Sequence, residues 1–220
     1  MPGKNIKALG DKPLLQYTAE AAKQARLISE TIISTDSEEI AKVAEQLGIE
    51  VPFIRPAALA TDTASSIDVV IHAVNFLSGE KRNYDAICLL QPTNPFRQKG
   101  FIDKAIDKFL QAGTDSLISV LRVPHEFNPH WVFETTLNGT LVISTGEKEI
   151  IPRRQDLPHA FYRDGSIYLT RTKVILQQKS FFGESISYIE NDPNFHVNID
   201  TPEDWEIAHD LCKKFVVRSS

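Results

Sequence analysis

The chain contains 220 residues, of which 42% are hydrophobic, and its formal net charge is −5 at pH 7. A chain of this length can bury one sizeable core and fits one domain better than two. The acidic total gives no basic field of the kind that nucleic-acid-binding proteins carry. No apolar run approaches the ~20 residues that cross a bilayer, and the first residues lack the apolar stretch of a signal peptide. We therefore expect a cytosolic protein.

The two cysteines, Cys88 and Cys212, both stand in apolar surroundings. Free cysteine is among the most often buried residue types, so we expect both in the core rather than in a disulfide or a metal pair. This usage favours a reducing compartment. The six histidines show no spacing typical of metal ligands.

Strand and helix patterns alternate through the first half of the chain. The strands are short and almost continuously apolar, which is typical of a mostly parallel sheet covered by helices on both faces. The expected elements are a helix opened by Asp11-Lys12-Pro13 and running to Ala25, a strand at 31–35, a helix capped by Asp36 or Ser37 and ended by Gly48, a strand at 50–54, a helix with its apolar face at 67–74, a strand at 85–90, a helix at 102–113 and a strand at 116–121.

The alternation stops near residue 123. The segment Leu137-Asn138-Gly139-Thr140-Leu141 predicts a hairpin, because Asn-Gly suits a type I′ turn. Residues 144–164 look irregular and charged, and a strand at 165–170 and a helix from about 202 to 215 follow. The sequence thus predicts a single α/β domain with a Rossmann-like sheet and an inserted arm at roughly 123–162.

Ligands of open parallel sheets bind at the carboxyl ends of the strands, which draws attention to the loop 91–97. Its two prolines stiffen the loop and hold Gln91 at the strand tip. The alternative is a rigid turn with no ligand and a solvated Arg97.

Asn198 and Asp200 stand two residues apart, and in a strand such residues share a face. Their oxygens would suit Mg²⁺. An equally good interpretation is that Asp200 or Thr201 caps the last helix, with Pro202 in its first turn.

Arg153, Arg154 and Arg163 lie in the irregular region. Arginine forks match carboxylates and phosphates, although a solvated basic patch is the simpler interpretation of any one of them. Lys4 follows a flexible Pro-Gly pair that would suit phosphates. Phe181-Phe182 stands beside Gly183, and such a pair is more often part of a core than of a pocket.

Taken together and in order, these segments resemble the acylneuraminate cytidylyltransferases, or CMP-sialic acid synthetases. The resemblance runs through nearly the whole chain, so residues 1–220 are expected to form one cytidylyltransferase domain. The matching segments are Pro2-Gly3-Lys4-Asn5, Ile33-Ser34-Thr35-Asp36-Ser37, Arg55-Pro56, Leu59-Ala60-Thr61-Asp62-Thr63-Ala64-Ser65-Ser66, Leu89-Leu90-Gln91-Pro92-Thr93, Arg153-Arg154-Gln155-Asp156-Leu157-Pro158, Asp164-Gly165-Ser166-Ile167-Tyr168, Phe181-Phe182 and Ile199-Asp200-Thr201-Pro202-Glu203-Asp204.

The resemblance implies a reaction in which the anomeric hydroxyl of a 2-keto-3-deoxy acidic sugar attacks the α-phosphorus of CTP and pyrophosphate leaves. The sugar would be sialic, legionaminic or pseudaminic acid, or an eight-carbon relative. Mg²⁺ would be the cofactor. The arm would reach into a partner subunit, which implies a homodimer.

The resemblance also assigns roles to individual residues. The implied catalytic residues are Lys4, Asp200 and Arg154, and Asp200 with Asn198 would form the metal site. Lys4 and Asn5 would contact the nucleotide and its phosphates, Arg55 and Ser66 the cytidine end, Gln91 the sugar, Arg154 the sugar carboxylate, Phe181 and Phe182 the acyl or side-chain pocket, and Arg153 and Arg163 the substrate more generally.

Three features depart from the family pattern. The family usually has Asp where Asn198 stands, and an Arg where Tyr162 stands, with Arg163 adjacent. The family's first strand and its Arg- and Gly-containing phosphate loop precede the position of Lys4. We therefore expect the natural protein to begin about a dozen residues upstream, allowing ~5–6 residues for the strand, and the chain as given to be less stable and weakly active or inactive.

Two rival functions remain at this point. One is a cytidylyltransferase for the eight-carbon sugar 3-deoxy-octulosonate, against which the Phe181-Phe182 pair and the closeness of the whole motif set argue. The other is a non-catalytic nucleotide or sugar binder, which Asn198 and the absent loop would favour.

Overall fold

The computed structural model describes residues 3–61 and 63–219, and the chain divides into two compact units. The first unit comprises the residues up to Ser119 together with those from Asp164 onward, and the second is Val120–Arg163. Met1 and Pro2, to which the expected upstream strand would connect, lie outside the described residues.

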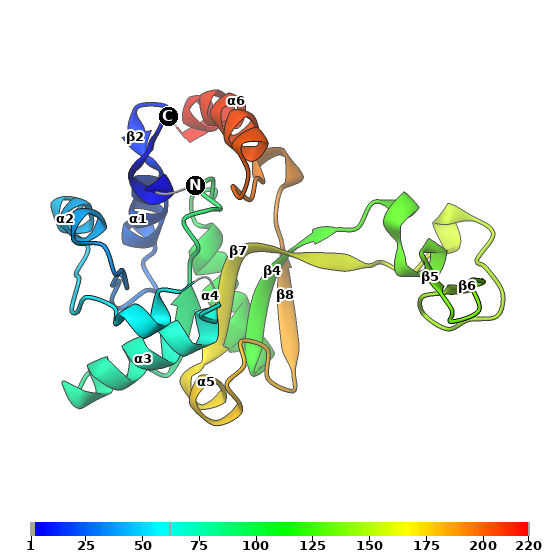
Figure 1. Ribbon diagram of the computed structural model, residues 1–220, viewed down its shortest axis with the longest axis horizontal. Coiled ribbons are helices and arrows are strands. Elements are labelled where there is room, and N and C mark those ends of the chain that lie inside the picture. The colour runs from blue at the N-terminus through cyan, green and yellow to red at the C-terminus, as the bar shows by residue number, and fades with distance from the viewer. Residues whose placement is uncertain (1–2, 62, 220) are drawn as a thin grey trace. The chain divides into compact units, whose positions relative to one another are not determined.

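A mixed four-stranded sheet forms the centre of the first unit, with the strand order β3-β7-β4-β8 (Figure 1). The strands are β3 (Ala86–Leu89), β4 (Ser116–Arg122), β7 (Phe161–Arg171) and β8 (Ile186–Glu190). Strand β7 is antiparallel to β3, with Ala86 opposite Arg171 and Leu89 opposite Tyr168.

The α/β fold is confirmed, but the sheet is mixed rather than mostly parallel. A parallel neighbour needs a crossover connection, usually a helix. Strand β7 has none, because the chain leaves β4 at Arg122 and returns into β7 at Phe161 through the second unit. The strands expected at 31–35 and 50–54 are reduced to two isolated parallel bridges, Ile32 with Glu50 and Thr35 with Ile54.

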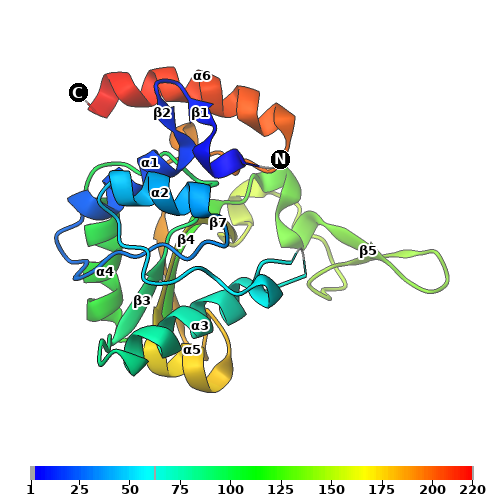
Figure 2. The same cartoon turned by 60° about the vertical axis from the view of Figure 1, so that its left-hand side comes forward.

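Helices cover both faces of this sheet. Figure 2 shows α4 (Phe101–Ala112) on one side and α3 (Ser66–Gly79) with α5 (Thr172–Gln178) on the other. The residues that pack between α4 and the sheet are Phe101, Ile102, Ala105, Phe109, Leu117, Ile167 and Leu169. Helix α2 (Glu38–Gln46) begins at Ser37, whose side chain accepts a hydrogen bond from the Ile40 N–H, so Ser37 rather than Asp36 is the cap.

A second core lies under α6 (Pro202–Ser219), which runs along the two-stranded ribbon β1 (Ala8–Leu9) and β2 (Lys12–Pro13) in Figure 2. This ribbon replaces the expected start of the first helix, and α1 is Leu14–Gln24 with Pro13 at its cap position. The buried members of this core are Leu9, Leu14, Tyr17, Phe96, Phe195, Val197, Ile199, Trp205, Ala208 and Cys212. Cys212 and Cys88 are both free, as predicted.

The second unit contains a hairpin of β5 (Phe133–Thr135) and β6 (Leu141–Ile143). The predicted hairpin is confirmed, but its turn is not the type I′ turn that Asn138-Gly139 would suit. A type I′ turn needs a positive φ at both central residues, and of Asn138 and Gly139 only Gly139 has one. Thr136 instead donates its N–H to the Thr140 carbonyl at 2.8 Å and closes a longer loop.

Short 3-10 turns complete both units: Lys4–Ile6, Ala57–Leu59 and Pro193–Phe195 in the first, and His125–Phe127, Pro129–Trp131 and Arg154–Asp156 in the second. Within the described part of the chain, no helix has the length and hydropathy that crossing a membrane would require.

Candidate active site

The loop that follows β3 is held in place by a buried arginine. Arg97 is only 3% exposed. Its guanidinium donates to the Ser166 carbonyl at 2.8 and 3.1 Å, to the Gln91 carbonyl at 2.9 Å and to Thr18 Oγ1 at 2.9 Å. Burial lowers the pKa of Arg97 to about 10. The alternative interpretation of a solvated Arg97 is therefore wrong, because this side chain ties the loop to β7 and α1.

Residues 196–200, which form no strand in the structure, lie against this loop. The Ile199 N–H donates to the Thr93 carbonyl at 2.9 Å, and the side-chain amides of Asn94 and Asn198 meet at 3.1 Å. Val197 and Ile199 are buried whereas Asn198 and Asp200 are exposed. The alternation places Asn198 and Asp200 on one side, as the two-residue spacing predicts.

A glycine in β7 makes room for this junction. Gly165 has a φ of +80°, and a Cβ at this position would lie 3.0 Å from the Asn94 amide nitrogen and 3.3 Å from Gln91 Oε1. Any other residue would be strained by the positive φ and crowded by these two side chains. Gly165 therefore lets the strand pass close behind Gln91 and Asn94.

Lys4 reaches this segment from the N-terminal 3-10 turn. Its Nζ donates to the Ile199 carbonyl at 2.6 Å and lies 3.5 Å from Asp200 Oδ1. The other carboxylate oxygen of Asp200 accepts a hydrogen bond from the Asn198 side chain. Asn5 follows Lys4 in the same turn. The structure thus brings Lys4, Asn198 and Asp200 together beside the Gln91 loop.

Helix α6 is capped by Thr201 and not by Asp200, so the Asp200 side chain is not needed for the cap. Thr201 Oγ1 accepts from the Asp204 N–H at 3.2 Å, and the Asp204 carboxylate accepts from the Thr201 N–H at 2.8 Å. This is the reciprocal arrangement of a capping box. Hydrogen bonds from the backbone of Thr201 and Asp200 hold the pKa of Asp204 below its usual 3.8. Thr201 is the cap, and the Asp200 side chain remains 63% exposed.

The donors present fit a magnesium ion only with help from a substrate. Among the described residues, no group of three or more His, Cys, Asp or Glu side chains could hold a metal. Mg²⁺ is commonly bound by one or two carboxylates together with substrate phosphates, and the exposed carboxylate of Asp200 meets that requirement. Asn198 donates its N–H to Asp200, so its amide would have to turn to offer an oxygen.

Arg55 and Ser66 are the residues expected at the cytidine end; Arg55 follows the isolated bridge of Thr35 with Ile54, and Ser66 begins α3. Arg55 Nη2 bonds Asp36 Oδ1 at 2.6 Å, and this bond lowers the pKa of the Asp36 carboxyl. Ser66 is the exposed first residue of α3, which is capped by Ser65. Within the described part of the chain, Arg55 Nε and Ser34 Oγ are buried without a hydrogen-bond partner, which is uncommon for buried polar atoms.

Phe181 and Phe182 line the sheet rather than the Lys4 group. Their rings lie 5.8 and 6.4 Å from the ring of Tyr168. Their carbonyls accept hydrogen bonds from Thr170 Oγ1 and Ser116 Oγ, at the end of the sheet where β3 begins. The close approach depends on Gly183, where a Cβ would lie 2.5 Å from the Cβ of Asp115.

The predicted arginines Arg153, Arg154 and Arg163 belong to the second unit, and all three are exposed. Arg153 is engaged by Asp156 at 2.7 Å. Arg154 opens onto a pocket of about 440 Å³ within this unit. Its lining carries cationic groups and no carboxylate, and consists of Arg122, Val123, Pro124, His125, Asn128, Arg154, Gln155, Leu157, Pro158, His159 and Ala160. Such a pocket suits an anion.

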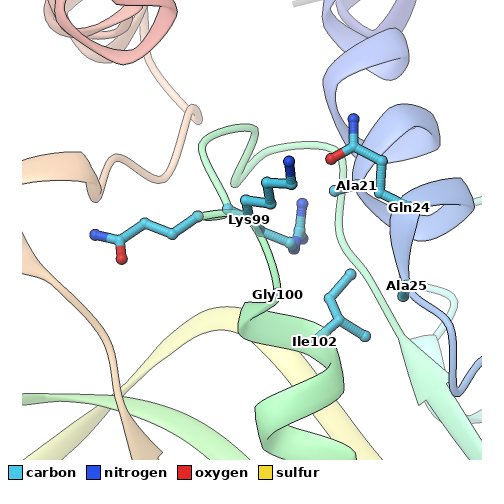
Figure 3. Close-up of a pocket in the computed structure, with 8 residues that line it drawn as sticks. Ala21, Gln24, Ala25, Lys99, Gly100 and Ile102 are labelled. Atoms are coloured by element: carbon cyan, nitrogen blue, oxygen red, sulfur yellow. The ribbon is translucent and has the colours of Figure 1, made fainter. Parts of the chain in front are cut away.

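A much smaller cavity in the first unit, of about 20 Å³, lies where α4 begins. Lys99 comes to it from the loop before α4 and Gln24 from α1, as Figure 3 shows. A space of this size holds about one water molecule, so it offers no room for a substrate.

The sequence did not predict the buried polar residues that support the site, namely Asp164, Asn94 and Arg97. Asp164 is 4% exposed, and its carboxylate accepts hydrogen bonds from Ser119 and Asn191. Asn94 and Arg97 are buried as well. The sequence signal that could have found them is their position: each of these polar residues stands in or next to a segment that carries a predicted site residue or matches the family.

Comparison with known proteins identifies the family of this chain. The family model described as "Cytidylyltransferase" matches residues 1–220. A CMP-N,N'-diacetyllegionaminic acid synthase of Legionella pneumophila is 35% identical over 97% of this chain and 90% of its own length. An N-acylneuraminate cytidylyltransferase of Escherichia coli is 32% identical over 96% of this chain, which spans 48% of that longer protein.

Among solved structures, a CMP:2-keto-3-deoxy-manno-octonic acid synthetase complexed with CTP superposes with a TM-score of 0.69 at 18% identity, over 97% of this chain and 93% of that one. A likeness at this identity supports the α/β fold alone. The family match and the relatives at 30% identity or more confirm the resemblance read from the sequence motifs. This chain therefore belongs to the cytidylyltransferase family and is a nucleotidyltransferase.

Proposed function

We propose that this protein transfers CMP from CTP to the anomeric hydroxyl of an acidic 2-keto-3-deoxy sugar of the sialic, legionaminic or pseudaminic type. A bond forms between the sugar oxygen and the α-phosphorus while the bond from that phosphorus to pyrophosphate breaks. The observation that carries the proposal is the group of Lys4, Asn198 and Asp200 beside the Gln91 loop. The names of the relatives, which act on acids of this kind, support the choice of acceptor.

The chain's own part in this reaction would be to place the reactants and neutralise charge. The ammonium of Lys4 is held by the Ile199 carbonyl at 2.6 Å, so it is already fixed when a phosphate arrives. A charge that needs no reorganisation stabilises a developing phosphate charge more than a mobile one. Asn5, in the same turn, would contact the nucleotide, and Gln91 at the strand tip would contact the sugar.

The cofactor would be Mg²⁺, held by Asp200 and by phosphate oxygens of CTP, with Asn198 beside it. The ion would supply charge neutralisation at the phosphates and help to orient the attacking hydroxyl. Lys4 Nζ lies 3.5 Å from Asp200 Oδ1, so the ammonium offsets part of the charge of the carboxylate that would hold the ion.

The acceptor's carboxylate would be bound by Arg154, whose pocket also contains Arg122 and no carboxylate. A planar guanidinium can grip a carboxylate with two parallel hydrogen bonds. Arg153 and Arg163 would add positive charge to the same unit.

The second unit would also form a homodimer by reaching into a second copy of the chain. Several large apolar side chains of this unit are exposed, including Phe127 at 69%, Leu137 at 108% and Leu141 at 63%. Apolar side chains left exposed in this number within one small unit would be covered in a dimer, which supports the proposal. Sedimentation of the wild type and of a Leu141→Glu variant tests this, since a dimer built on this unit should dissociate in the variant and a monomeric wild type would contradict the proposal.

Pyrophosphate release with CTP, Mg²⁺ and a panel of acidic sugars tests the reaction itself. We expect release only in the presence of a sialic-, legionaminic- or pseudaminic-type acid, and little with UTP, ATP or GTP. Turnover restricted to 3-deoxy-octulosonate would assign the protein to that sugar instead. Binding of CTP without pyrophosphate release from any acid would identify a non-catalytic relative and refute the proposal.

A further inference from the structure

The ion pair of Asp36 and Arg55 lies where two parallel segments end. Thr35 and Ile54 form a parallel bridge, and the Arg55 N–H donates to the Thr35 carbonyl at 2.8 Å. Asp36 and Arg55 are the next residues along each segment, so both emerge at the same edge. The position of Asp36 is further fixed by its neighbour Ser37, which caps α2.

The contact engages one side of the guanidinium and leaves another unused. Nη2 of Arg55 lies 2.6 Å from Asp36 Oδ1, and the Arg55 side chain is 22% exposed. Among the described residues, the Nε of Arg55 is buried and has no partner. An unpaired buried N–H is costly unless a ligand supplies the missing acceptor.

A second unpaired group lies in the same short segment. Ser34 stands two residues before Asp36 and next to Thr35, which forms the bridge with Ile54. The hydroxyl of Ser34 is buried, and no residue that the structure describes bonds to it. Two unsatisfied groups therefore accompany the ion pair at one strand end.

The charges at this edge indicate which part of a ligand it would accept. Asp36 offsets the positive charge of Arg55, and its pKa is lowered by that same contact, so it stays ionised at neutral pH. A neutral pair attracts phosphate weakly, whereas unpaired N–H and O–H groups suit the carbonyl and hydroxyl oxygens of a pyrimidine nucleoside.

We propose that Asp36 is a positioning residue for the nucleotide: it holds Arg55 by its outer nitrogen, leaves Nε directed at the nucleoside, and keeps phosphates away from this end of the site. The proposal rests on the proposed function in taking a cytidine nucleotide as the ligand. It adds that the orientation of the nucleotide is set by Asp36, a residue that would not itself contact the nucleotide.

Direct binding measured by calorimetry on the full chain tests this without requiring turnover. The probes are CTP, cytidine and inorganic tripolyphosphate, and the variant is Asp36→Asn. A hydrogen bond to a charged group is worth enough that CTP and cytidine should bind about tenfold more weakly. Tripolyphosphate should bind more tightly, because the charge of Arg55 is no longer offset. A residue that only stabilised the fold would not move these two affinities in opposite directions.

Glu20→Gln is the matched control, because it removes a partly exposed ion pair to Lys12 of 2.9 Å elsewhere in the same unit. It should leave all three affinities unchanged. Arg55→Lys is a second variant, since a lysine can keep the ion pair but lacks Nε; it should weaken cytidine binding as much as Asp36→Asn does.

The outcomes separate this inference from the proposed function. Unchanged binding of cytidine and tripolyphosphate in Asp36→Asn, with CTP-dependent turnover intact in the wild type, overturns the role of Asp36 alone. A wild type that binds no CTP overturns both. If Asp36→Asn does not fold, unchanged cytidine binding in Arg55→Lys overturns the inference in its place.

Discussion

Asp200 and Thr201 are adjacent, but we expect Asp200 to act in turnover and Thr201 to stabilise α6, and mutation can separate the two roles. We expect Asp200→Ala to lose turnover while keeping its stability, and Thr201→Ala to lose stability while keeping most of its turnover. Thr201 Oγ1 caps α6 by accepting from the Asp204 N–H at 3.2 Å. Asp200 contributes no cap; its carboxylate contacts Lys4 at 3.5 Å and is 63% exposed.

The expected magnitudes follow from these contacts. Loss of an N-cap costs about 1 kcal/mol, and for a chain of this size that lowers the melting temperature by roughly 2–4 °C. The Lys4–Asp200 pair is too exposed to contribute more than a few tenths of a kcal/mol after solvent screening, so Asp200→Ala should melt within about 1 °C of the wild type. Removing a charge that acts on the transition state should lower kcat/KM by about a hundredfold or more.

Thermal denaturation and Mg²⁺-dependent pyrophosphate release measure the two effects on the same samples. Asp210→Asn is the control, because it removes an exposed carboxylate from the same helix, paired to Lys213 at 3.2 Å, and should change neither quantity. The reasoning would be refuted by an Asp200→Ala variant that melts several degrees lower and turns over normally, because Asp200 would then be structural.

The remaining predictions concern other contacts of the site. Arg97→Met should lower the free energy of unfolding by about 3–5 kcal/mol, measured by urea denaturation, because it leaves buried carbonyls unpaired; a change under 1 kcal/mol would contradict this. Arg154→Lys should raise KM for the sugar by roughly 10- to 150-fold without changing that for CTP, since Lys cannot form a bidentate fork. Asn198→Asp should tighten Mg²⁺ binding, seen by calorimetry in the presence of CTP. Because the folded state lowers the pKa of Asp204 from 3.8, its stabilisation is present above that pH and lost below it; the difference in melting temperature between wild type and Asp204→Asn should shrink as the pH falls through this range.

The sequence predicted those features that depend on neighbours along the chain. The alternation of Val197 and Ile199 with Asn198 and Asp200 is such a feature, and the structure confirms it. Helix positions were also found, because an apolar face every three to four residues is a local signal. The start of α1 was misjudged, since Lys12 and Pro13 are used in a ribbon that packs under α6, far away in sequence.

Long-range partners explain what the sequence concealed. Arg97 looked like a solvated side chain because its main acceptor, the Ser166 carbonyl, lies 69 residues further along. The mixed sheet was hidden for a related reason. Strand β7 has the apolar pattern of a buried strand in either direction, and only the return of the chain from the second unit makes it antiparallel to β3.

Asn198 shows how a departure from a family pattern changes meaning once its partners are known. From the sequence it was a lost charge at a metal site. In the structure it donates a hydrogen bond to Asp200, while Lys4 lies 3.5 Å from the other oxygen of that carboxylate. A carboxylate at position 198 could not donate, and two acids on one face would repel each other unless a cation lay between them. Asn198 therefore allows Lys4, Asn198 and Asp200 to form one hydrogen-bonded and ion-paired group. Under the proposed function, the same substitution would leave one carboxylate fewer to hold Mg²⁺, so the donor that stabilises this group is also the reason that we expect Asn198→Asp to bind the ion more tightly.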